Sequence, residues 1–233
     1  MSEGVSETLK ATVDAFQRAV FEQQPVGPEH YSEEYFASDW REDDNRYDVE
    51  TRRRIEDRNP HLIKEVFEPR KVLDLGCGPG FLMFFLHELG VDVDGIDFSP
   101  ESVTLAPEPI RERIRVGAVT EPIVAEQGYD LVVCREVFEH LTVLQVRQAV
   151  AQLCRASSRY VYVTTRFHPE PETLLDFTTQ FEVDPSHITL LTKQFLRCLL
   201  VLEGFRQRPD LEQRMDWGGK GRVLVHERQP ASA

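Results

Sequence analysis

Three glycines at alternate positions end a short apolar run near residue 75. Residues 72 to 80 read Val-Leu-Asp-Leu-Gly-Cys-Gly-Pro-Gly. Because glycine has no Cβ, the backbone there can adopt a positive φ and a ligand can lie directly against main-chain N–H groups. Residues 81 to 89 read as a helix, and its N-terminus would point unpaired N–H groups and its positive dipole end at the turn. A strand, a glycine turn and a helix in this order predict a site for a nucleotide cofactor.

The spacing of the glycines separates the possible cofactors. A dinucleotide site has the pattern G-x-G-x-x-G, whereas here the third glycine comes one residue early and Phe81 follows. Together with the aspartate before the turn, the string D-x-G-x-G-x-G resembles motif I of the class I S-adenosylmethionine-dependent methyltransferases. This resemblance implies S-adenosylmethionine as the cofactor. It also implies cofactor-binding roles for Asp74, Gly76, Cys77, Gly78 and Gly80.

A second predicted strand, residues 91 to 97, ends in an acid. Asp97 follows Asp74 by about the 20 positions expected for the acid that binds ribose hydroxyls in a βαβ unit of this kind. Phe98 beside it could lie on the adenine, and Ser99 could cap the next helix, which Pro100 begins. The string Gly-Ile-Asp-Phe-Ser at residues 95 to 99 resembles the second motif of the same family.

The third motif departs from the family pattern. Residues 114 to 116 read as a short strand, and Ala118 then stands where the family commonly has the aspartate that receives the adenine amino group. Alanine cannot do so. Adenine recognition is therefore left to the main chain of Ala118 and Val119, or to Glu121.

The fourth strand, residues 129 to 134, is apolar at its centre, as expected of a strand covered on both faces. Cys134 and Arg135 at its carboxyl end are predicted to bind the cofactor, because open α/β sheets place their ligands at that edge. The following Val-Phe-Glu-His-Leu resembles the post-strand motif of small-molecule O-methyltransferases, such as those of ubiquinone biosynthesis and antibiotic-sugar tailoring. It does not resemble the Asp/Asn-Pro-Pro-Tyr/Phe motif of enzymes that methylate nucleic-acid bases.

Methyl transfer to a hydroxyl requires removal of a proton, and histidine is the usual base near pH 7. We expect His140 to orient or deprotonate the acceptor, with Glu139 and Glu136 behind it; packing at a helix start is the alternative. Tyr31, Tyr35, His168 and His187 are the expected substrate contacts, although His187 could equally stabilise its loop. No metal is predicted, since no carboxylate-histidine cluster is visible in the sequence. The remaining histidines, His30, His61, His87 and His226, are expected at the surface.

Composition limits the partners. The chain has 233 residues, 41% hydrophobic residues and a net charge of −13, which disfavours nucleic acid as a partner. No apolar run approaches the ~18 residues of a membrane span, and the N-terminus does not read as a secretion signal. These features predict a cytoplasmic monomer or homodimer that acts on a small molecule. The four cysteines show no C-x-x-C pair and are expected to be buried thiols.

The predicted fold class is α/β: a Rossmann-like, doubly wound sheet of seven strands, mostly parallel, with an antiparallel C-terminal hairpin. Residues 1–67 are expected to form a helical lid that includes a helix at 6 to 22, a helix capped by Asp48, and a break at Asn59-Pro60. Residues 68–228 form the predicted cofactor domain, with a cap segment at 166–190, and residues 229–233 a disordered tail. Thr142 and Thr192 are predicted to cap the helices that follow them.

These observations together predict methyl transfer from S-adenosylmethionine to a small molecule, at a hydroxyl oxygen of a sugar or natural-product intermediate. Two alternatives stay open: N-methylation of an amino sugar or another small amine, and cofactor binding without catalysis in a regulatory protein. A nicotinamide oxidoreductase is disfavoured by the glycine spacing.

Overall fold

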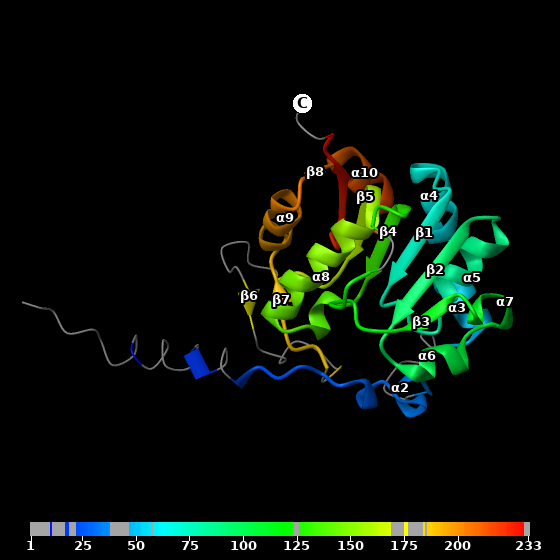
Figure 1. The fold of residues 1–233 in the computed structure, drawn as a ribbon, viewed down its shortest axis with the longest axis horizontal. Helices are drawn as coiled ribbons and strands as arrows, with labels where there is room; N and C mark the ends of the chain where they lie inside the picture. Colours follow the sequence, from blue (N-terminus) through cyan, green and yellow to red (C-terminus); the bar gives the residue numbers. More distant parts are fainter. Residues whose placement is uncertain are drawn as a thin grey trace, which may run out of the picture.

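A seven-stranded sheet organises the chain (Figure 1). The computed structural model describes residues 10, 17–18, 22–37, 47–56, 58–123, 126–168, 175–176, 184 and 186–230. The strand order is β3-β2-β1-β4-β5-β9-β8, with β1 to β5 parallel and β9 antiparallel to both neighbours, which confirms the predicted sheet. The strands are β1 (Lys71–Leu75), β2 (Asp92–Asp97), β3 (Ile114–Val116), β4 (Tyr129–Arg135), β5 (Ser157–Thr164), β8 (Phe205–Gln207) and β9 (Val223–Arg228). A separate antiparallel pair joins β6 (Leu175–Asp176) to β7 (Leu190–Leu191).

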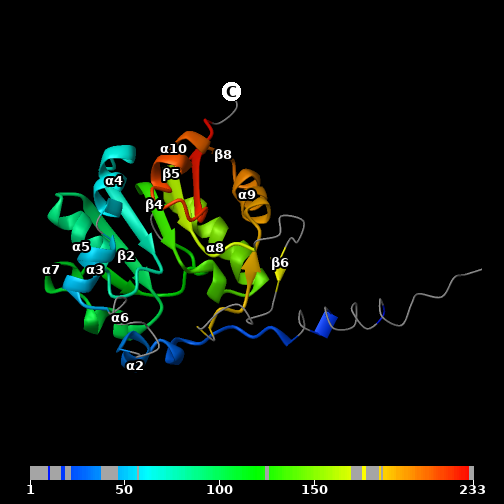
Figure 2. The ribbon, with the colours of Figure 1, turned by 180° about the vertical axis from the view of Figure 1, so that it is seen from behind.

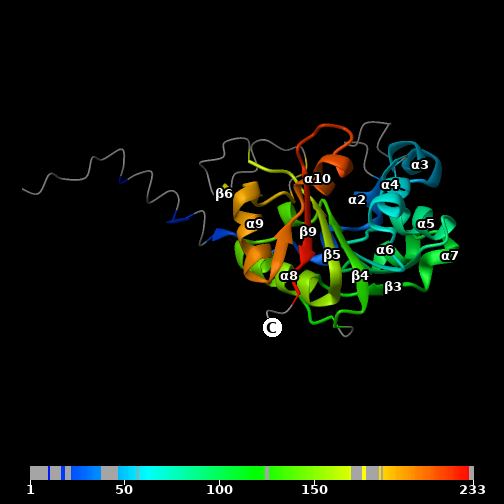
Figure 3. The ribbon, with the colours of Figure 1, turned by 90° about the horizontal axis from the view of Figure 1, so that it is seen from above.

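Helices cover both faces of the sheet (Figure 3). They are η1 (Pro28–His30), α2 (Glu33–Ala37), α3 (Val49–Glu56), α4 (Arg58–Phe67), α5 (Phe81–Glu88), α6 (Pro100–Leu105), α7 (Glu108–Arg111), η3 (Phe138–His140), α8 (Val143–Ala156), α9 (Lys193–Leu202) and α10 (Pro209–Met215). Alternate residues of β4 enter two separate cores. Val132 and Cys134 pack with α8 and α9, whereas Leu131 and Val133 pack with α4, α5 and α10. A central strand buried on both faces needs apolar residues throughout, which explains the continuous apolar run.

Polar side chains begin the helices where the sequence predicted caps. Asp48 accepts a hydrogen bond from the Thr51 N–H at 2.8 Å, and Ser99 accepts one from the Glu101 N–H at 3.2 Å. Thr142 forms a reciprocal capping box with Gln145, and Thr192 accepts from the Phe195 N–H. These bonds satisfy N–H groups that the first turn of a helix leaves without partners.

Some local predictions were wrong. Two helices are present, as predicted, but α3 ends at Glu56 and α4 begins at Arg58, so Pro60 lies in the first turn of α4, where its missing N–H needs no partner. The sequence did not indicate α10. His226 is fully buried instead of exposed, and Cys198 is exposed instead of buried. The predicted helix at residues 6 to 22 and the tail at 229–233 fall mostly outside the described residues.

The N-terminal segment lies along the edge where the parallel strands end. In Figures 1 and 2 its blue ribbon passes along this edge, and α2 lies next to α6. The Ser99 hydroxyl, at the start of α6, donates to the Tyr31 carbonyl at 2.6 Å, which ties the segment to the end of β2. Helix α3 packs on α5. Among the described residues no helix combines the length and apolar character needed to cross a bilayer.

Candidate active site

The glycine turn after β1 is held in the conformation that the sequence predicted. Gly76, Gly78 and Gly80 all have positive φ, at 75°, 53° and 74°. A Cβ on Gly76 would lie 2.3 Å from Val137 Cγ2, and one on Gly80 would lie 2.7 Å from Ile110 Cδ1. At Gly78 a Cβ would meet only a Phe36 ring atom at 4.0 Å, so this part of the turn faces open space. The main chain of Gly78 is therefore accessible to a ligand.

Asp97 at the end of β2 faces the same turn. Its Oδ2 accepts from the Gly78 N–H at 2.8 Å and its Oδ1 from the Ser99 N–H at 3.0 Å. Burial raises the pKa of Asp97, while the two main-chain hydrogen bonds oppose that rise. Each carboxylate oxygen has a second lone-pair direction. The carboxylate is thus fixed in place and retains acceptor capacity for a ligand.

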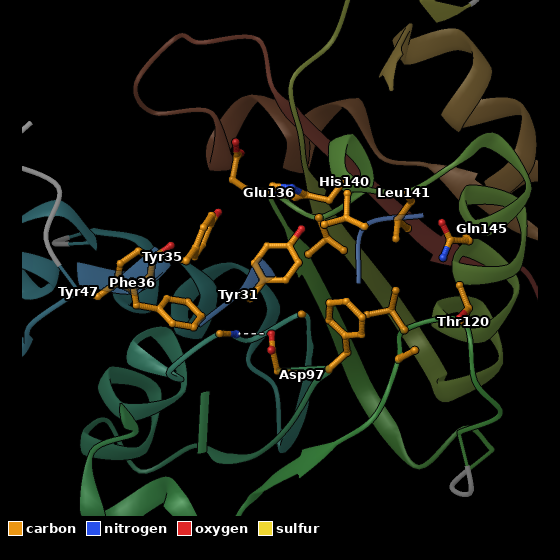
Figure 4. A pocket seen from close by; sticks show the side chains of 17 residues that line it. Tyr31, Tyr35, Phe36, Tyr47, Asp97, Thr120, Glu136, His140, Leu141 and Gln145 are labelled. Carbon is orange, nitrogen blue, oxygen red and sulfur yellow. Dashed lines mark hydrogen bonds between the residues drawn. The ribbon is translucent and has the colours of Figure 1, made fainter. Parts of the chain in front are cut away.

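A cavity of roughly 790 Å³, open to solvent, extends from this acid toward η3 (Figure 4). In Figure 4, Asp97 lies at the lower edge, Glu136 and His140 at the upper edge, Tyr31 near the centre, and Tyr35 and Tyr47 toward the left. The lining comprises Val26, Tyr31, Tyr35, Phe36, Tyr47, Gly76, Gly78, Asp97, Phe98, Ala118, Val119, Thr120, Glu136, Val137, His140, Leu141 and Gln145.

Aromatic side chains from the N-terminal segment form one wall of this first cavity. The Tyr31 ring lies 4.9 Å from Tyr35, 5.6 Å from Phe98 and 5.7 Å from His140, in each case edge-on. Burial strongly raises the pKa of the Tyr31 phenol, so Tyr31 is neutral at pH 7. These contacts place both predicted substrate tyrosines beside the predicted catalytic histidine.

His140 is held at the upper edge by the loop that precedes β7. Its Nδ1 lies 2.8 Å from Ser186 Oγ, and its ring lies 4.7 Å from that of His187. Ser186 Oγ in turn lies 2.5 Å from Asp184 Oδ1, and the Tyr35 hydroxyl donates to Asp184 Oδ2 at 2.9 Å. Burial, together with His187, lowers the pKa of His140 to about 3. The imidazole is therefore neutral at pH 7 and keeps a lone pair.

Glu139 is buried behind His140 and does not line the cavity. Thr165 donates to its Oε2 at 2.6 Å, and burial raises its pKa to about 8, with Glu136 adding to the rise. Its main-chain carbonyl accepts from the N–H groups of Ile188 and Thr189, at 2.8 and 3.1 Å. Glu139 is thus largely protonated near pH 7, and its main chain anchors the loop that carries Ser186.

One group of side chains in the described part of the chain has spacing that would admit a metal ion. Ligand atoms of Glu139, His140 and His187 lie within 4.8 Å of one another. No spacing in the sequence indicates this cluster, because His187 is far along the chain from the other two residues. The expectation of a site without metal stays a prediction.

A second cavity adjoins the first across Gly76, Gly78, Tyr47 and Glu136, which line both. It holds a partly buried ion pair, with Arg135 Nη1 at 2.7 Å from Glu56 Oε2. Asp74, which is 4% exposed, lies near this pair. Burial raises the pKa of Asp74 to about 7, and the charge of Arg135 partly opposes the rise. Arg52 also lines this cavity, with its guanidinium 3.9 Å from the centre of the Tyr47 ring.

The structure does not bring every predicted residue to a cavity wall. Ser99 is fully buried and serves as a helix cap and tether, and Cys134 is buried in the core. His168 is absent from both linings, and its N–H donates to the Leu191 carbonyl at 2.8 Å. Sequence reasoning missed several residues that the fold brings to the site: Phe36, Tyr47, Glu56, Thr120, Gln145, Asp184 and Ser186.

Comparison with known families favours a methyltransferase over a dinucleotide-binding oxidoreductase. The family model for a methyltransferase domain matches residues 72–158, which include the glycine turn, Asp97 and His140. Residues 72–158 thus resemble a methyltransferase domain. This confirms the resemblance to the class I S-adenosylmethionine-dependent methyltransferases over the segment that carries the motifs.

Curated relatives of the methyltransferase domain match over this region. The O-antigen chain terminator bifunctional methyltransferase/kinase of Escherichia coli is 32% identical over 118 residues, which cover 47% of this chain and 16% of that protein. The ubiquinone biosynthesis O-methyltransferase of Bordetella avium is 36% identical over 78 residues, covering 31% of this chain and 32% of that protein. The chain thus spans less than half the length of these relatives.

A solved methyltransferase structure shares the fold of this chain. Magnesium protoporphyrin IX methyltransferase from Synechocystis PCC 6803, solved with bound S-adenosylmethionine, superposes with a TM-score of 0.59 and 18% identity. The match covers 89% of this chain and all of that one. At this identity the likeness establishes the fold, and it is consistent with the predicted cofactor.

Proposed function

We propose that this chain binds S-adenosylmethionine and transfers its methyl group to a hydroxyl of a small molecule. One observation carries the proposal: the glycine turn, the Asp97 carboxylate and the neutral imidazole of His140 all face a single cavity. The first two features suit a nucleoside, and the third suits proton removal from an acceptor.

The two cavities divide the cofactor between them in this proposal. Asp97 would accept from the ribose hydroxyls. The adenine would lie against Phe98, with the main chain of Ala118 and Val119 or the Thr120 hydroxyl at its edge. Thr120 is the one addition to the partners expected from sequence.

The methionine end would extend along Gly76 and Gly78 toward the second cavity. There Asp74 would face the ammonium group, and Arg52 would meet the carboxylate. Ion pairs of this kind are worth most where water is excluded.

The residues of this chain supply position and proton transfer. The bound cofactor would supply a methyl group already activated by its positive sulfur. The aromatic wall of Tyr31, Tyr35 and Phe36 would exclude water from the acceptor. His140 lines the cavity, where it would accept a hydrogen bond from the acceptor hydroxyl and take its proton as the methyl group is transferred.

Oxygen is the preferred methyl acceptor on two grounds. A neutral imidazole at the cavity edge is useful for a hydroxyl and unnecessary for a free amine. The matched relative from Bordetella avium is named as an O-methyltransferase. The acidic residues that raised the amino-sugar alternative, 42 to 44, lie outside the described residues. A sugar or natural-product hydroxyl remains the proposed acceptor.

Calorimetric titration with S-adenosylhomocysteine tests the cofactor. We expect micromolar binding to the wild type and at least a tenfold loss, about 1.4 kcal/mol, in Asp97→Ala. Asp92→Ala is the matched control, because that acid is on the same strand but is exposed and paired with Arg113. Binding of NAD in place of S-adenosylhomocysteine would overturn the proposal.

Turnover then separates the remaining alternatives. Purified protein with labelled S-adenosylmethionine is offered phenols, sugar hydroxyls and amino sugars in parallel. Label transfer to a hydroxyl supports the proposal, and transfer only to an amine supports N-methylation. Tight cofactor binding without transfer to any of these acceptors would favour the regulatory alternative.

A further inference from the structure

The Ser186 hydroxyl lies between His140 and Asp184, which both can accept its single proton, and the Tyr31 phenol also hydrogen-bonds to Ser186. His140 Nδ1 is 2.8 Å from Ser186 Oγ, and Asp184 Oδ1 is 2.5 Å from the same atom. Ser186 is 2% exposed and Asp184 is 5% exposed, so water has little access to either. The direction of the hydroxyl proton therefore decides which form of the imidazole can exist.

Asp184 is held as a carboxylate by the donors around it. The Ser186 N–H donates to Oδ1 at 2.9 Å, and the Tyr35 hydroxyl donates to Oδ2 at 2.9 Å. His187 Nε2 lies 3.8 Å from Oδ2. These hydrogen bonds lower the pKa of Asp184 although its burial acts in the opposite direction. An ionised carboxylate can only accept hydrogen bonds.

The short distance between the two oxygens places the proton. Hydrogen bonds from a hydroxyl to a carboxylate are about 2.5–2.7 Å long, and two oxygens at this separation without a proton between them would repel. Ser186 Oγ–H therefore donates to Asp184. Because a serine hydroxyl has one proton, Ser186 Oγ can only accept from its other partners. The neutral Tyr31 phenol, which also hydrogen-bonds to Ser186, has its own proton to donate, and the donor on the imidazole is His140 Nδ1–H.

We propose that Ser186 and Asp184 are positioning residues that hold His140 as its Nδ1–H tautomer, with the Nε2 lone pair directed to the first cavity. The second ring nitrogen of a neutral histidine is then an acceptor. Among the described residues no hydrogen bond reaches His140 Nε2, while His140 itself lines the cavity. The ring is held by the edge contacts with Tyr31 and His187.

This assignment deepens the proposed function, on which it rests for its consequence. An Nε2 lone pair can accept the proton of an acceptor hydroxyl, whereas an Nε2–H group could only donate to the acceptor. The arrangement thus specifies an acceptor that gives up a proton, such as a hydroxyl, over one that is methylated through a free lone pair. Tyr35 has a second role here, because it links the aromatic wall to Asp184.

Nitrogen NMR reads the tautomer directly and requires neither cofactor nor turnover. The full chain, labelled with ¹⁵N-histidine, is recorded by long-range ¹H–¹⁵N correlation at pH 7.5 with EDTA, so that no metal contributes. His140→Gln identifies the His140 signals by their loss. The wild type should show a protonated Nδ1 and an unprotonated Nε2 at His140.

Two serine variants and a control make the test decisive. Ser186→Ala should shift His140 toward the Nε2–H tautomer or a mixture of the two tautomers, and Ser186→Thr should keep the wild-type pattern. The control is Ser158→Ala, which should leave the His140 signals unchanged, because the Ser158 hydroxyl donates to the Tyr129 carbonyl outside the site. An Nε2–H wild type, or an unchanged Ser186→Ala spectrum, would overturn the assignment. This result is independent of whether S-adenosylhomocysteine binds, so the two proposals can fail separately.

Kinetics provide the functional readout once an acceptor is found. Ser186→Ala should lower kcat by about tenfold or more, within the range of a displaced general base, while KM for S-adenosylmethionine changes little. Ser186→Thr should restore kcat. An equal fall in kcat for both variants would indicate a loop defect and contradict the positioning role.

Discussion

Arg135 and Glu56 form a partly buried ion pair, with Nη1 2.7 Å from Oε2, that ties helix α3 to the carboxyl end of β4. Asn59 also donates to Glu56, at 2.9 Å, and Trp217 donates to Asn59 at 3.0 Å. The chain of contacts connects the N-terminal helices, the central strand and the loop after α10 around the second cavity. Breaking these contacts should therefore reduce both the free energy of unfolding and the affinity for the cofactor.

Glu56→Gln should reduce the free energy of unfolding by roughly 1.5–3 kcal/mol, because it replaces the counter-charge of the partly buried Arg135 guanidinium by a neutral amide. Urea unfolding measures the change. The matched control is Glu88→Gln, which breaks the exposed pair with Arg53 and should cost less than about 1 kcal/mol. Equal effects of the two substitutions would show that the buried pair has no special role.

Gly76→Ala should impair the glycine turn through two separate effects. Positive φ costs an alanine about 1–2 kcal/mol, and the new Cβ would lie 2.3 Å from Val137 Cγ2. Gly90→Ala is the control for φ alone, since Gly90 has a φ of 78° and no atom within 4 Å of its Cβ position. The midpoint of thermal unfolding should be lower for Gly76→Ala than for Gly90→Ala. Adding Val137→Ala to Gly76→Ala should recover part of this difference in midpoint. A Gly90→Ala variant as unstable as Gly76→Ala would rule out the clash.

Cofactor binding should release a proton from Asp74. Its pKa is raised to about 7, so below that pH the carboxyl is largely protonated, and a nearby ammonium group favours the ionised form. Affinity for S-adenosylhomocysteine should therefore rise as the pH increases toward 7 and level off above it. Calorimetry at pH 6.5 in buffers of different ionisation enthalpy measures the released proton. In Asp74→Asn the buffer dependence should be lost; its persistence would assign the proton to another group.

His226 should make the fold sensitive to acid. It is fully buried, neither ring nitrogen has a hydrogen-bond partner, and burial lowers its pKa to about 4. In the unfolded chain the histidine has a pKa near ~6.5, so as the pH falls the unfolded state binds the proton first. The contribution of neutral His226 to the free energy of unfolding is therefore fully present above pH ~6.5 and is lost as the pH falls toward 4. The loss from pH 7 to pH 5 should be about 2 kcal/mol.

Urea titrations at the two pH values measure the acid sensitivity. His226→Phe should reduce the difference between pH 7 and pH 5, and His61→Gln, at an exposed position on α4, should leave it unchanged. An undiminished difference in His226→Phe would assign the acid sensitivity to other groups, such as His140.

The sequence by itself determined the elements whose signals are local. The glycine turn, the acid ending β2, the caps at Asp48, Ser99, Thr142 and Thr192, and the apolar strands were all predictable. Each depends on backbone conformation or hydrogen bonding within a few residues, and residue types report this directly. A proline can either interrupt a helix or lie in its first turn, and for Pro60 the sequence pattern did not distinguish these two positions.

Only the tertiary structure decided how distant segments meet. Asp184 and Ser186 lie more than forty positions from His140, and Glu56 lies almost eighty from Arg135, so no spacing rule connects them. Burial of His226 likewise depends on how β9 packs between β5 and β8 beside α9. Such pairings arise because a parallel sheet gathers the ends of separated strands at one edge. The packing around these strand ends then determines which polar groups lie together in a site from which water is excluded.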